Sequence, residues 1–448
     1  MKKIDRRTFI KGAGAASVTA ALAAHGISLA AGPAQNASGK MEYRTGGNGD
    51  RVSLLGFGCM RMPTVDGTWN GEVDLEQQFA LVDYALEHGV NYFDTAPVYT
   101  GGRSEEYTGL ALSRHPRESY YIATKLSNHR GDFSFEFGKN MYLNSFKNLK
   151  VDYIDYYLMH NIGRSIESFN ERFVDNGLLD FLVEERAEGR IRNLGWSFHG
   201  NQETFDHILS LHEKYHWDFV QIQMNYLDWN HAGGGFNINA SYLYGELSAR
   251  DIPITIMEPL RGGALANVPV NVSRKMQERR PGDSAARWAF RFAGTYPRIL
   301  SVLSGMTYME HLQDNIATFS GFEPCSEDEL AFLERLAIEI TNFPTVGCTA
   351  CNYCMPCPYG IDIPGTFAHY NKCVNEEQMP LSSGDENYRK LRRAFLLGYD
   401  RSVPALHQAS HCIGCGQCLA KCPQHINIPS EMSRIDNFCE TLRQGKSF

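Results

Sequence analysis

Strand-like and helical segments alternate regularly along residues 53–303, and this alternation limits the possible folds more than any other feature. Short apolar runs typical of buried strands are followed by longer runs with helical periodicity. The strand-like runs are continuously apolar, as expected for parallel strands covered on both faces. The eight predicted strands span residues 53–60, 90–93, 120–124, 153–159, 191–197, 219–224, 252–257 and 299–303.

Eight such units predict an α/β fold, a (β/α)8 barrel at residues 41–322 that begins with a small hairpin within residues 41–62. An open doubly wound sheet is the alternative. That fold would bring a glycine-rich dinucleotide turn, and Gly56-Phe57-Gly58 lacks the third glycine. The predicted helices between the strands include residues 75–87, 137–148, 178–188, 203–215 and 284–293.

Length and charge set further bounds. A chain of 448 residues with 43% hydrophobic residues exceeds the roughly 250 to 300 residues at which single cores stop growing, so we expect two domains. The net charge of -8 provides no basic surplus for binding phosphate backbones. We therefore expect no nucleic-acid partner.

Eight of the 12 cysteines fall into two short runs, each followed by proline. The second run has the spacing of bacterial ferredoxins, and the first is one residue short in its last gap. They predict two [4Fe-4S] clusters, with the fourth cysteine of each run on the other cluster. Structural zinc sites are the alternative. The two predicted ligand sets are Cys348, Cys351, Cys354 and Cys422, and Cys412, Cys415, Cys418 and Cys357.

Residues 344–448 are thus predicted to form a mainly helical, ferredoxin-like iron-sulfur domain. Residues 323–343 would form the helix that links it to the barrel, and residues 387–397 a helical insertion between the two runs. The domain resembles helical ferredoxin domains of respiratory enzymes. The other four cysteines are interpreted as buried thiols, namely Cys59, Cys325, Cys373 and Cys439.

The N-terminus carries Arg6-Arg7 followed by a weakly apolar, Ala/Gly-rich run to Ala31. It resembles a twin-arginine leader, which predicts a signal peptide at residues 1–34, a linker at 35–40, and export to the periplasm or otherwise by that route. A basic disordered N-terminus or a short anchor is the alternative. No other run is long and apolar enough to predict a membrane span in the mature chain.

Four polar side chains follow successive predicted strands: Asp94 and Tyr99 after the second, Lys125 after the third and His160 after the fourth. Each alone has an ordinary structural explanation. As a set they resemble the catalytic tetrad of the aldo/keto reductases, a resemblance that covers residues 42–319. It implies that Tyr99 is the general acid and base, since a phenol of pKa about 10 donates protons poorly unless a cation lowers that pKa.

By the same resemblance, Lys125 supplies the cation, Asp94 pairs with the ammonium group, and His160 hydrogen-bonds the carbonyl oxygen. The resemblance also implies NADP or NAD at the barrel mouth. Phe198, Met257 and a loop at 305–311 without Lys or Arg depart from the family's nucleotide pattern. The implied cofactor residues are Ser197, Gln221, Pro259, Leu260, Arg261, Gly262, Ser304, Gly305 and Asn315. For Ser197 and Gln221, ordinary hydrogen bonding at the end of a strand is the alternative role.

The combination predicts an exported iron-sulfur oxidoreductase that reduces a small-molecule carbonyl or oxidises an alcohol. Hydride carries two electrons while each cluster accepts one, so an additional carrier or another donor is needed. A second hypothesis is an electron-transfer subunit whose clusters relay electrons to a protein or membrane partner, with the barrel as scaffold. A third is that the clusters only brace the C-terminus.

Overall fold

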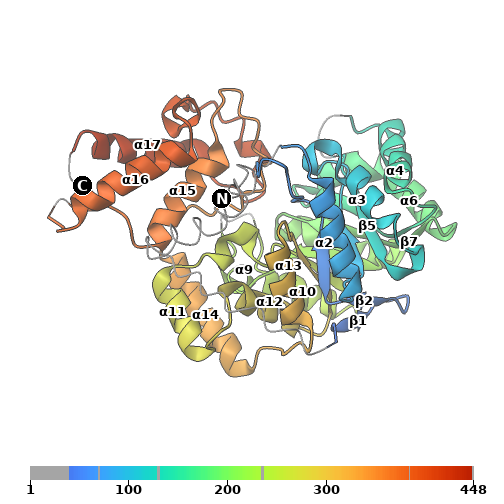
Figure 1. Ribbon diagram of the computed structural model, residues 1–448. Helices are drawn as coiled ribbons and strands as arrows, with labels where there is room; N and C mark the ends of the chain where they lie inside the picture. Colours follow the sequence, from blue (N-terminus) through green and yellow to red (C-terminus); the bar gives the residue numbers. More distant parts are fainter. Residues whose placement is uncertain (1–39, 69–70, 129–131, 234–236, 383, 446–448) are drawn as a thin grey trace, which may run out of the picture. The chain divides into compact units, whose positions relative to one another are not determined.

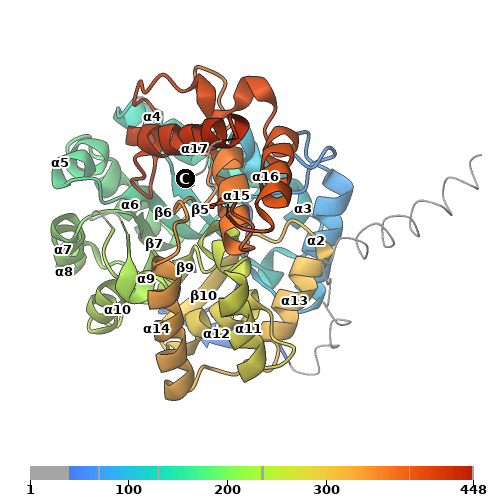
Figure 2. The same cartoon turned by 90° about the vertical axis from the view of Figure 1, so that its left-hand side faces the viewer.

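The computed structural model describes residues 40–68, 71–128, 132–233, 237–382 and 384–445. The predicted leader and nearly all of the linker lie outside these residues. Eight parallel strands close into a barrel, which confirms the predicted fold. Figure 2 shows the strands surrounded by helices. The barrel strands are β3 (Leu55–Gly58), β4 (Tyr92–Asp94), β5 (Tyr121–Leu126), β6 (Ile154–Ile162), β7 (Ile191–Phe198), β8 (Phe219–Gln223), β9 (Ile254–Met257) and β10 (Ile299–Ser304).

Helices follow every barrel strand and cover the outside of the sheet. The strand interiors are fully buried, as the continuous apolar runs predict. The helices of this part are α2 (Leu75–Glu87), α3 (Ser104–Leu112), α4 (Phe135–Leu149), α5 (Ile166–Phe169), α6 (Leu178–Ala187), α7 (Gln202–Ser210), α8 (His212–Tyr215), α9 (Asp228–His231), α10 (Ala240–Ser248), α11 (Val270–Arg279), α12 (Ala285–Thr295), α13 (Met309–Phe319) and α14 (Glu327–Thr341).

A hairpin of β1 (Tyr43–Thr45) and β2 (Arg51–Ser53) closes the amino-terminal end of the barrel. In its turn, a carboxylate oxygen of Asp50 accepts hydrogen bonds from Tyr156 Oη at 2.9 Å and Asn193 Nδ2 at 3.1 Å. Both partners come from barrel strands, β6 and β7. The opposite, carboxyl-terminal end is where a barrel of this kind carries its reaction site.

Two expectations differ from the structure. The first barrel strand is shorter than residues 53–60, because Ser53 belongs to the hairpin. The helix expected at 203–215 is two helices, α7 and α8, with Leu211 between them. Apolar periodicity continues across that break, since Tyr215 is buried like Phe205 and Ile208, so the pattern alone does not reveal it.

The C-terminal segment has its own hydrophobic core, separate from that of the barrel. Its helices lie side by side in Figure 1. The helix expected at 387–397 is confirmed by α16 and extends beyond those bounds. The three helices are α15 (Ile363–Asn375), α16 (Tyr388–Ser402) and α17 (Ile428–Arg443). Among the described residues, no helix combines the length and apolar character needed to cross a membrane.

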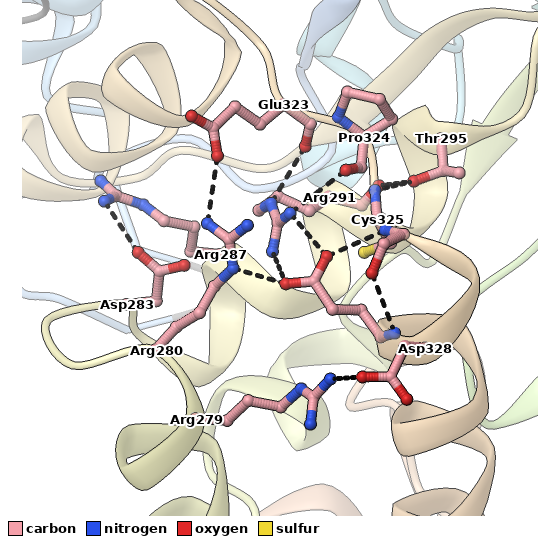
Figure 3. Close-up of polar contacts among 12 residues, drawn as sticks. Arg279, Arg280, Asp283, Arg287, Arg291, Thr295, Glu323, Pro324, Cys325 and Asp328 are labelled. Atoms are coloured by element: carbon pink, nitrogen blue, oxygen red, sulfur yellow. Dashed lines mark hydrogen bonds and ion pairs between the residues drawn. The ribbon is translucent and has the colours of Figure 1, made fainter.

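The predicted linking helix, α14, is joined to α12 by ion pairs and hydrogen bonds between charged side chains (Figure 3). Glu329 accepts from Arg291 Nη2 at 3.0 Å and Arg280 Nε at 2.5 Å, and it completes a capping box with Ser326. Burial opposes ionisation of Glu329, but the hydrogen bonds from Arg291, the backbone N–H of Ser326 and Arg280 lower its pKa to about 2. This carboxylate therefore connects the barrel wall to the helix that leads into the C-terminal domain.

We expect Glu329→Gln to lower the free energy of unfolding by about 1–3 kcal/mol at neutral pH, because two guanidinium groups lose a charged acceptor. The folded-state pKa is depressed, so the advantage of the native carboxylate is present above pH ~4.5 and is lost as the pH falls toward 2. Urea unfolding of both proteins at several pH values measures this. Asp328→Asn is the matched control, since Asp328 pairs with Arg279 in an exposed position, and an equal loss there would contradict the assignment.

Candidate active site

The four predicted catalytic residues meet at the carboxyl-terminal end of three neighbouring strands. Asp94 is the last residue of β4, Lys125 lies in β5, and His160 lies in β6. Tyr99 follows β4 on the next loop. Because β4, β5 and β6 are consecutive parallel neighbours, these side chains are brought to the same rim.

Lys125 and Asp94 form a buried ion pair. Lys125 Nζ lies 2.5 Å from Asp94 Oδ1 and also donates to the carbonyl oxygen of Thr95 at 2.8 Å. Gln221 Nε2 donates to the other carboxylate oxygen of Asp94 at 3.0 Å. Burial lowers the pKa of Lys125, and the neighbouring Asp94 carboxylate opposes that shift. The pair is thus held in a dry site with both carboxylate oxygens hydrogen-bonded.

Tyr99 lies against this pair and against His160. Lys125 Nζ is 5.2 Å from the centroid of the Tyr99 ring, and the His160 ring meets it edge-on at 5.7 Å between centroids. Burial raises the pKa of Tyr99 well above 10, and Tyr353, Asp94 and Glu258 act in the same direction. Tyr99 therefore keeps its proton at neutral pH, as a proton donor must.

The orientation of His160 depends on residues that sequence reasoning missed. Ser127 Oγ lies 2.6 Å from His160 Nδ1, and Arg172 donates to the carbonyl oxygen of His160 at 2.6 Å. With Ser127 as donor, the proton of the imidazole is on Nε2. The signal for Ser127 was its position directly after β5, two residues beyond Lys125. Arg172 lies in an irregular helical segment and gave no such signal.

The residues expected to contact a nucleotide are distributed around the same rim, and several are engaged within the chain. Ser197 Oγ accepts from the backbone N–H of Asn161 at 2.8 Å, and Gln221 binds Asp94. Asn315 Nδ2 donates to Ser304 Oγ at 3.0 Å. Arg261 Nε lies 3.5 Å from a carboxylate oxygen of the buried Asp228. Pro259, Leu260, Gly262 and Gly305 lie on the loops that follow β9 and β10.

The cysteines of the two runs influence one another's pKa in two groups. Burial raises the pKa of Cys354, and Cys351, Cys348 and Cys422 add to the shift. Burial likewise raises the pKa of Cys418, with contributions from three other thiols, which are Cys412, Cys415 and Cys357. Each group therefore contains three cysteines of one run and the last cysteine of the other.

A cavity at the second group fits an iron-sulfur cluster. Cys357, Cys412, Cys415 and Cys418 all line it. Within the described part of the chain, no three His, Cys, Asp or Glu side chains converge as ligands of a single metal ion. A [4Fe-4S] cube spreads four thiolates over four irons, and a thiol-lined cavity suits that arrangement. Such a cluster supplies one-electron transfer when it is bound.

Residues 54–338 match the family model described as aldo/keto reductase family. The chain belongs to the aldo/keto reductase family. It is an oxidoreductase of this type, and the match spans the whole barrel and the tetrad. Residues 347–426 match the model of a 4Fe-4S dicluster domain, so this aldo/keto reductase carries a ferredoxin-type iron-sulfur domain. Residues 3–23 match the twin-arginine translocation signal, which indicates export by that route.

Individual relatives agree with the family. A probable aldo-keto reductase from Glycine max is 33% identical over 250 residues, which cover 53% of this chain and 66% of the soybean protein. L-galactose dehydrogenase from Arabidopsis thaliana is 26% identical over 329 residues, 67% of this chain and 94% of that protein.

Solved structures of aldo-keto reductases share the fold. The holo form of one from Bacillus halodurans has a TM-score of 0.54 at 22% identity and covers 66% of this chain and 96% of that one. One from Klebsiella pneumoniae in complex with NADPH has a TM-score of 0.53 at 22% identity, with 66% and 95% covered.

Proposed function

We propose that this aldo/keto reductase interconverts a small-molecule carbonyl compound and its alcohol at the rim that holds Asp94, Tyr99, Lys125 and His160. The buried Lys125–Asp94 pair at 2.5 Å carries the proposal. A buried charge pair is expensive unless its geometry is good and its remaining oxygens are hydrogen-bonded, and perturbed ionisable groups gather at functional sites. Here the pair adjoins a protonated phenol and an oriented imidazole.

Tyr99 would donate its phenolic proton to the carbonyl oxygen during reduction and recover it during alcohol oxidation. His160 Nε2 would donate a hydrogen bond to the same oxygen and orient it. Lys125 would stabilise the phenolate that forms when Tyr99 gives up its proton, while Asp94 holds the ammonium group in place.

The domains follow the same proposal. A signal peptide at 1–34 and a linker at 35–40 precede the barrel at 41–322, the linking helix at 323–343 and the iron-sulfur domain at 344–448. We propose two [4Fe-4S] clusters on the crossed cysteine groups and a periplasmic location. NADP or NAD is the donor that the family resemblance offers, and the Klebsiella neighbour is in complex with NADPH.

A second function, electron transfer to a partner protein, is favoured by the surface around the second cysteine group. Cys415 is exposed, and Ile413 and Leu419 beside it are 63% and 42% exposed. Exposed apolar side chains next to a cluster cavity suit a transient contact with a one-electron carrier protein. This function is compatible with catalysis, because a reductase with clusters needs such a carrier to refill them.

The test replaces Asp94 by Asn and measures turnover of a panel of small aldehydes and ketones, with reduced methyl viologen and NADPH as alternative donors. We expect turnover about 10² to 10³-fold below wild type, because the ammonium group loses its counter-ion and its position. Asp155→Asn is the matched control, since Asp155 is as buried and pairs with Arg117 away from the rim. Unchanged turnover in Asp94→Asn, or an equal loss in Asp155→Asn, would contradict the proposal.

A further inference from the structure

Arg61, on the loop after β3, binds the iron-sulfur domain to the barrel rim. Its Nη2 donates to the carbonyl oxygens of Thr349 at 2.8 Å and Ala350 at 3.3 Å. Its Nη1 donates to the carbonyl oxygen of Gly262 at 3.4 Å, and its own carbonyl accepts from Thr307 Oγ1 at 3.2 Å. One residue thus joins the loops after β3, β9 and β10 to the first cysteine run.

Gly262 shows how closely the two parts approach. A Cβ atom built on Gly262 would lie 1.9 Å from the carbonyl oxygen of Thr349, so only glycine allows this contact. Gly262 also has a φ of +67°, a conformation that favours glycine. Thr349 itself is buried. The 259–263 loop, which the family resemblance assigns to nucleotide binding, is therefore covered by the chain's own backbone.

The same segment reaches the catalytic tyrosine. Burial raises the pKa of Tyr99, and Tyr353, between Cys351 and Cys354, and Glu258, directly after β9, act in the same direction. Burial likewise raises the pKa of Cys348 and Cys351, and Glu258 adds to both shifts. Glu258, which is half-buried, therefore lies close to both the Tyr99 phenol and the thiols of the first group.

Further along the chain, the second cysteine run contacts the same barrel face. Gln424 Nε2 donates to Gln223 Oε1 at 3.2 Å, and Arg164 Nη2 donates to the carbonyl oxygen of Ala420 at 2.5 Å. Asn237 Nδ2 donates to the carbonyl oxygen of Pro423 at 3.4 Å. These barrel residues come from the loop after β6, the end of β8 and the loop after it, so residues 420–424 are held at several points.

We propose that the segment 347–353 is a fixed wall of the reaction site and occupies the space between the 259–263 and 304–315 loops. The site therefore takes a small carbonyl substrate beside the first cysteine group. It binds no nicotinamide dinucleotide. The proposal rests on the carbonyl chemistry proposed above and identifies the electron source for it. The wall is built from backbone carbonyls that Arg61 holds, and opening it would leave this guanidinium group without those acceptors.

The electron and proton balance is complete without a nucleotide. Reduction of one carbonyl group to an alcohol takes two electrons and two protons. The electrons would come singly from the two clusters, which an external one-electron carrier protein refills. One proton comes from Tyr99 Oη and the other from solvent. The substrate class is a small aldehyde or ketone, because the segment 347–353 covers the 259–263 loop at the rim.

The first test uses the cluster-loaded wild-type protein under anaerobic conditions. NADPH and NADH binding are followed by nucleotide fluorescence, and the midpoint potentials of the clusters by EPR-monitored titration with and without carbonyl compounds from the panel. We expect no nucleotide binding, and a shift in the potential of one cluster when a carbonyl compound binds. Stoichiometric binding of NADPH to the loaded protein would overturn the proposal.

The second test compares Gly262→Ala with Gly263→Ala. Both glycines have positive φ, +67° and +100°, but a Cβ at Gly263 meets nothing within 4 Å. We expect Gly262→Ala to shift the midpoint potential of one cluster and to slow carbonyl turnover, while Gly263→Ala leaves both potentials unchanged. Equal effects in the two variants would mean that backbone strain alone is responsible, and the wall would be rejected.

The two proposals fail separately. If NADPH drives carbonyl turnover in the wild type and Tyr99→Phe abolishes it, the carbonyl chemistry stands and the wall is wrong. If neither NADPH nor reduced clusters drive carbonyl turnover, the proposed carbonyl chemistry is wrong, and the proposal for the segment 347–353, which rests on it, is wrong as well.

Discussion

Tyr99→Phe is expected to lower carbonyl turnover by about 10² to 10⁴-fold, the range that a positioned proton donor contributes. The substitution removes one oxygen atom and keeps the ring that packs against His160 at 5.7 Å. The burial that raises the pKa of Tyr99 also sets the pH dependence. Reduction needs the protonated phenol, so Tyr99 should not limit its rate as the pH rises to 10, whereas oxidation needs the phenolate and should accelerate with pH.

Tyr157→Phe is the control for this experiment. Tyr157 is fully buried, burial raises its pKa well above 10 as it does for Tyr99, and it lies in β6 outside the tetrad. Steady-state turnover with the carbonyl panel, measured from neutral pH to about pH 10, should be unchanged in this variant. Turnover near the wild-type rate in Tyr99→Phe would show that the phenol is not the proton donor.

Lys125→Met is expected to have the largest effect on stability. Asp94, which is 4% exposed, would keep Gln221 as a side-chain donor but lose its cation, and breaking a buried ion pair by removing one partner costs about 3–5 kcal/mol. Carbonyl turnover should fall as well, because the phenolate of Tyr99 loses its cation. The thermal midpoint and the urea midpoint of the cluster-loaded protein measure the first effect.

The double variant Asp94→Asn with Lys125→Met separates a charge effect from a packing effect. With both charges removed, most of the stability should return, since no uncompensated charge is left in the barrel. Lys147→Met, at an exposed position of α4, controls for the substitution itself. A double variant as unstable as Lys125→Met alone would mean that packing, not charge, explains the loss.

The barrel could be predicted because the strands are buried on both faces. Runs such as those around Phe93 and Tyr157 are mostly apolar and buried, and the helices between them follow their own period. The ends of the strands were harder to predict where a polar residue lies between two elements and could belong to either. The sequence predicts Ser53 as the start of a barrel strand, but Ser53 ends the hairpin strand β2. Its backbone N–H donates to the side chain of Asn91.

The proximity of Asp94, Lys125 and His160 was predictable for a related reason, since they lie near the carboxyl ends of neighbouring parallel strands. The supports of the tetrad were not. Arg172 and Gln221 contribute hydrogen bonds whose geometry depends on the closed barrel. The contact between Arg61 and Thr349 joins residues 288 positions apart, so no local pattern indicates it.

The most direct test of the account mixes anaerobically reduced, cluster-loaded wild-type protein with the carbonyl panel in a stopped-flow instrument, with Tyr99→Phe measured in parallel. The visible absorbance of the clusters reports their oxidation, and product analysis counts the alcohol formed. We expect the clusters of the wild type to be re-oxidised rapidly, with one alcohol formed per two electrons. In Tyr99→Phe, re-oxidation of the clusters should be slower by about 10²-fold or more. Equal rates in the two proteins, or re-oxidation without alcohol, would contradict the account.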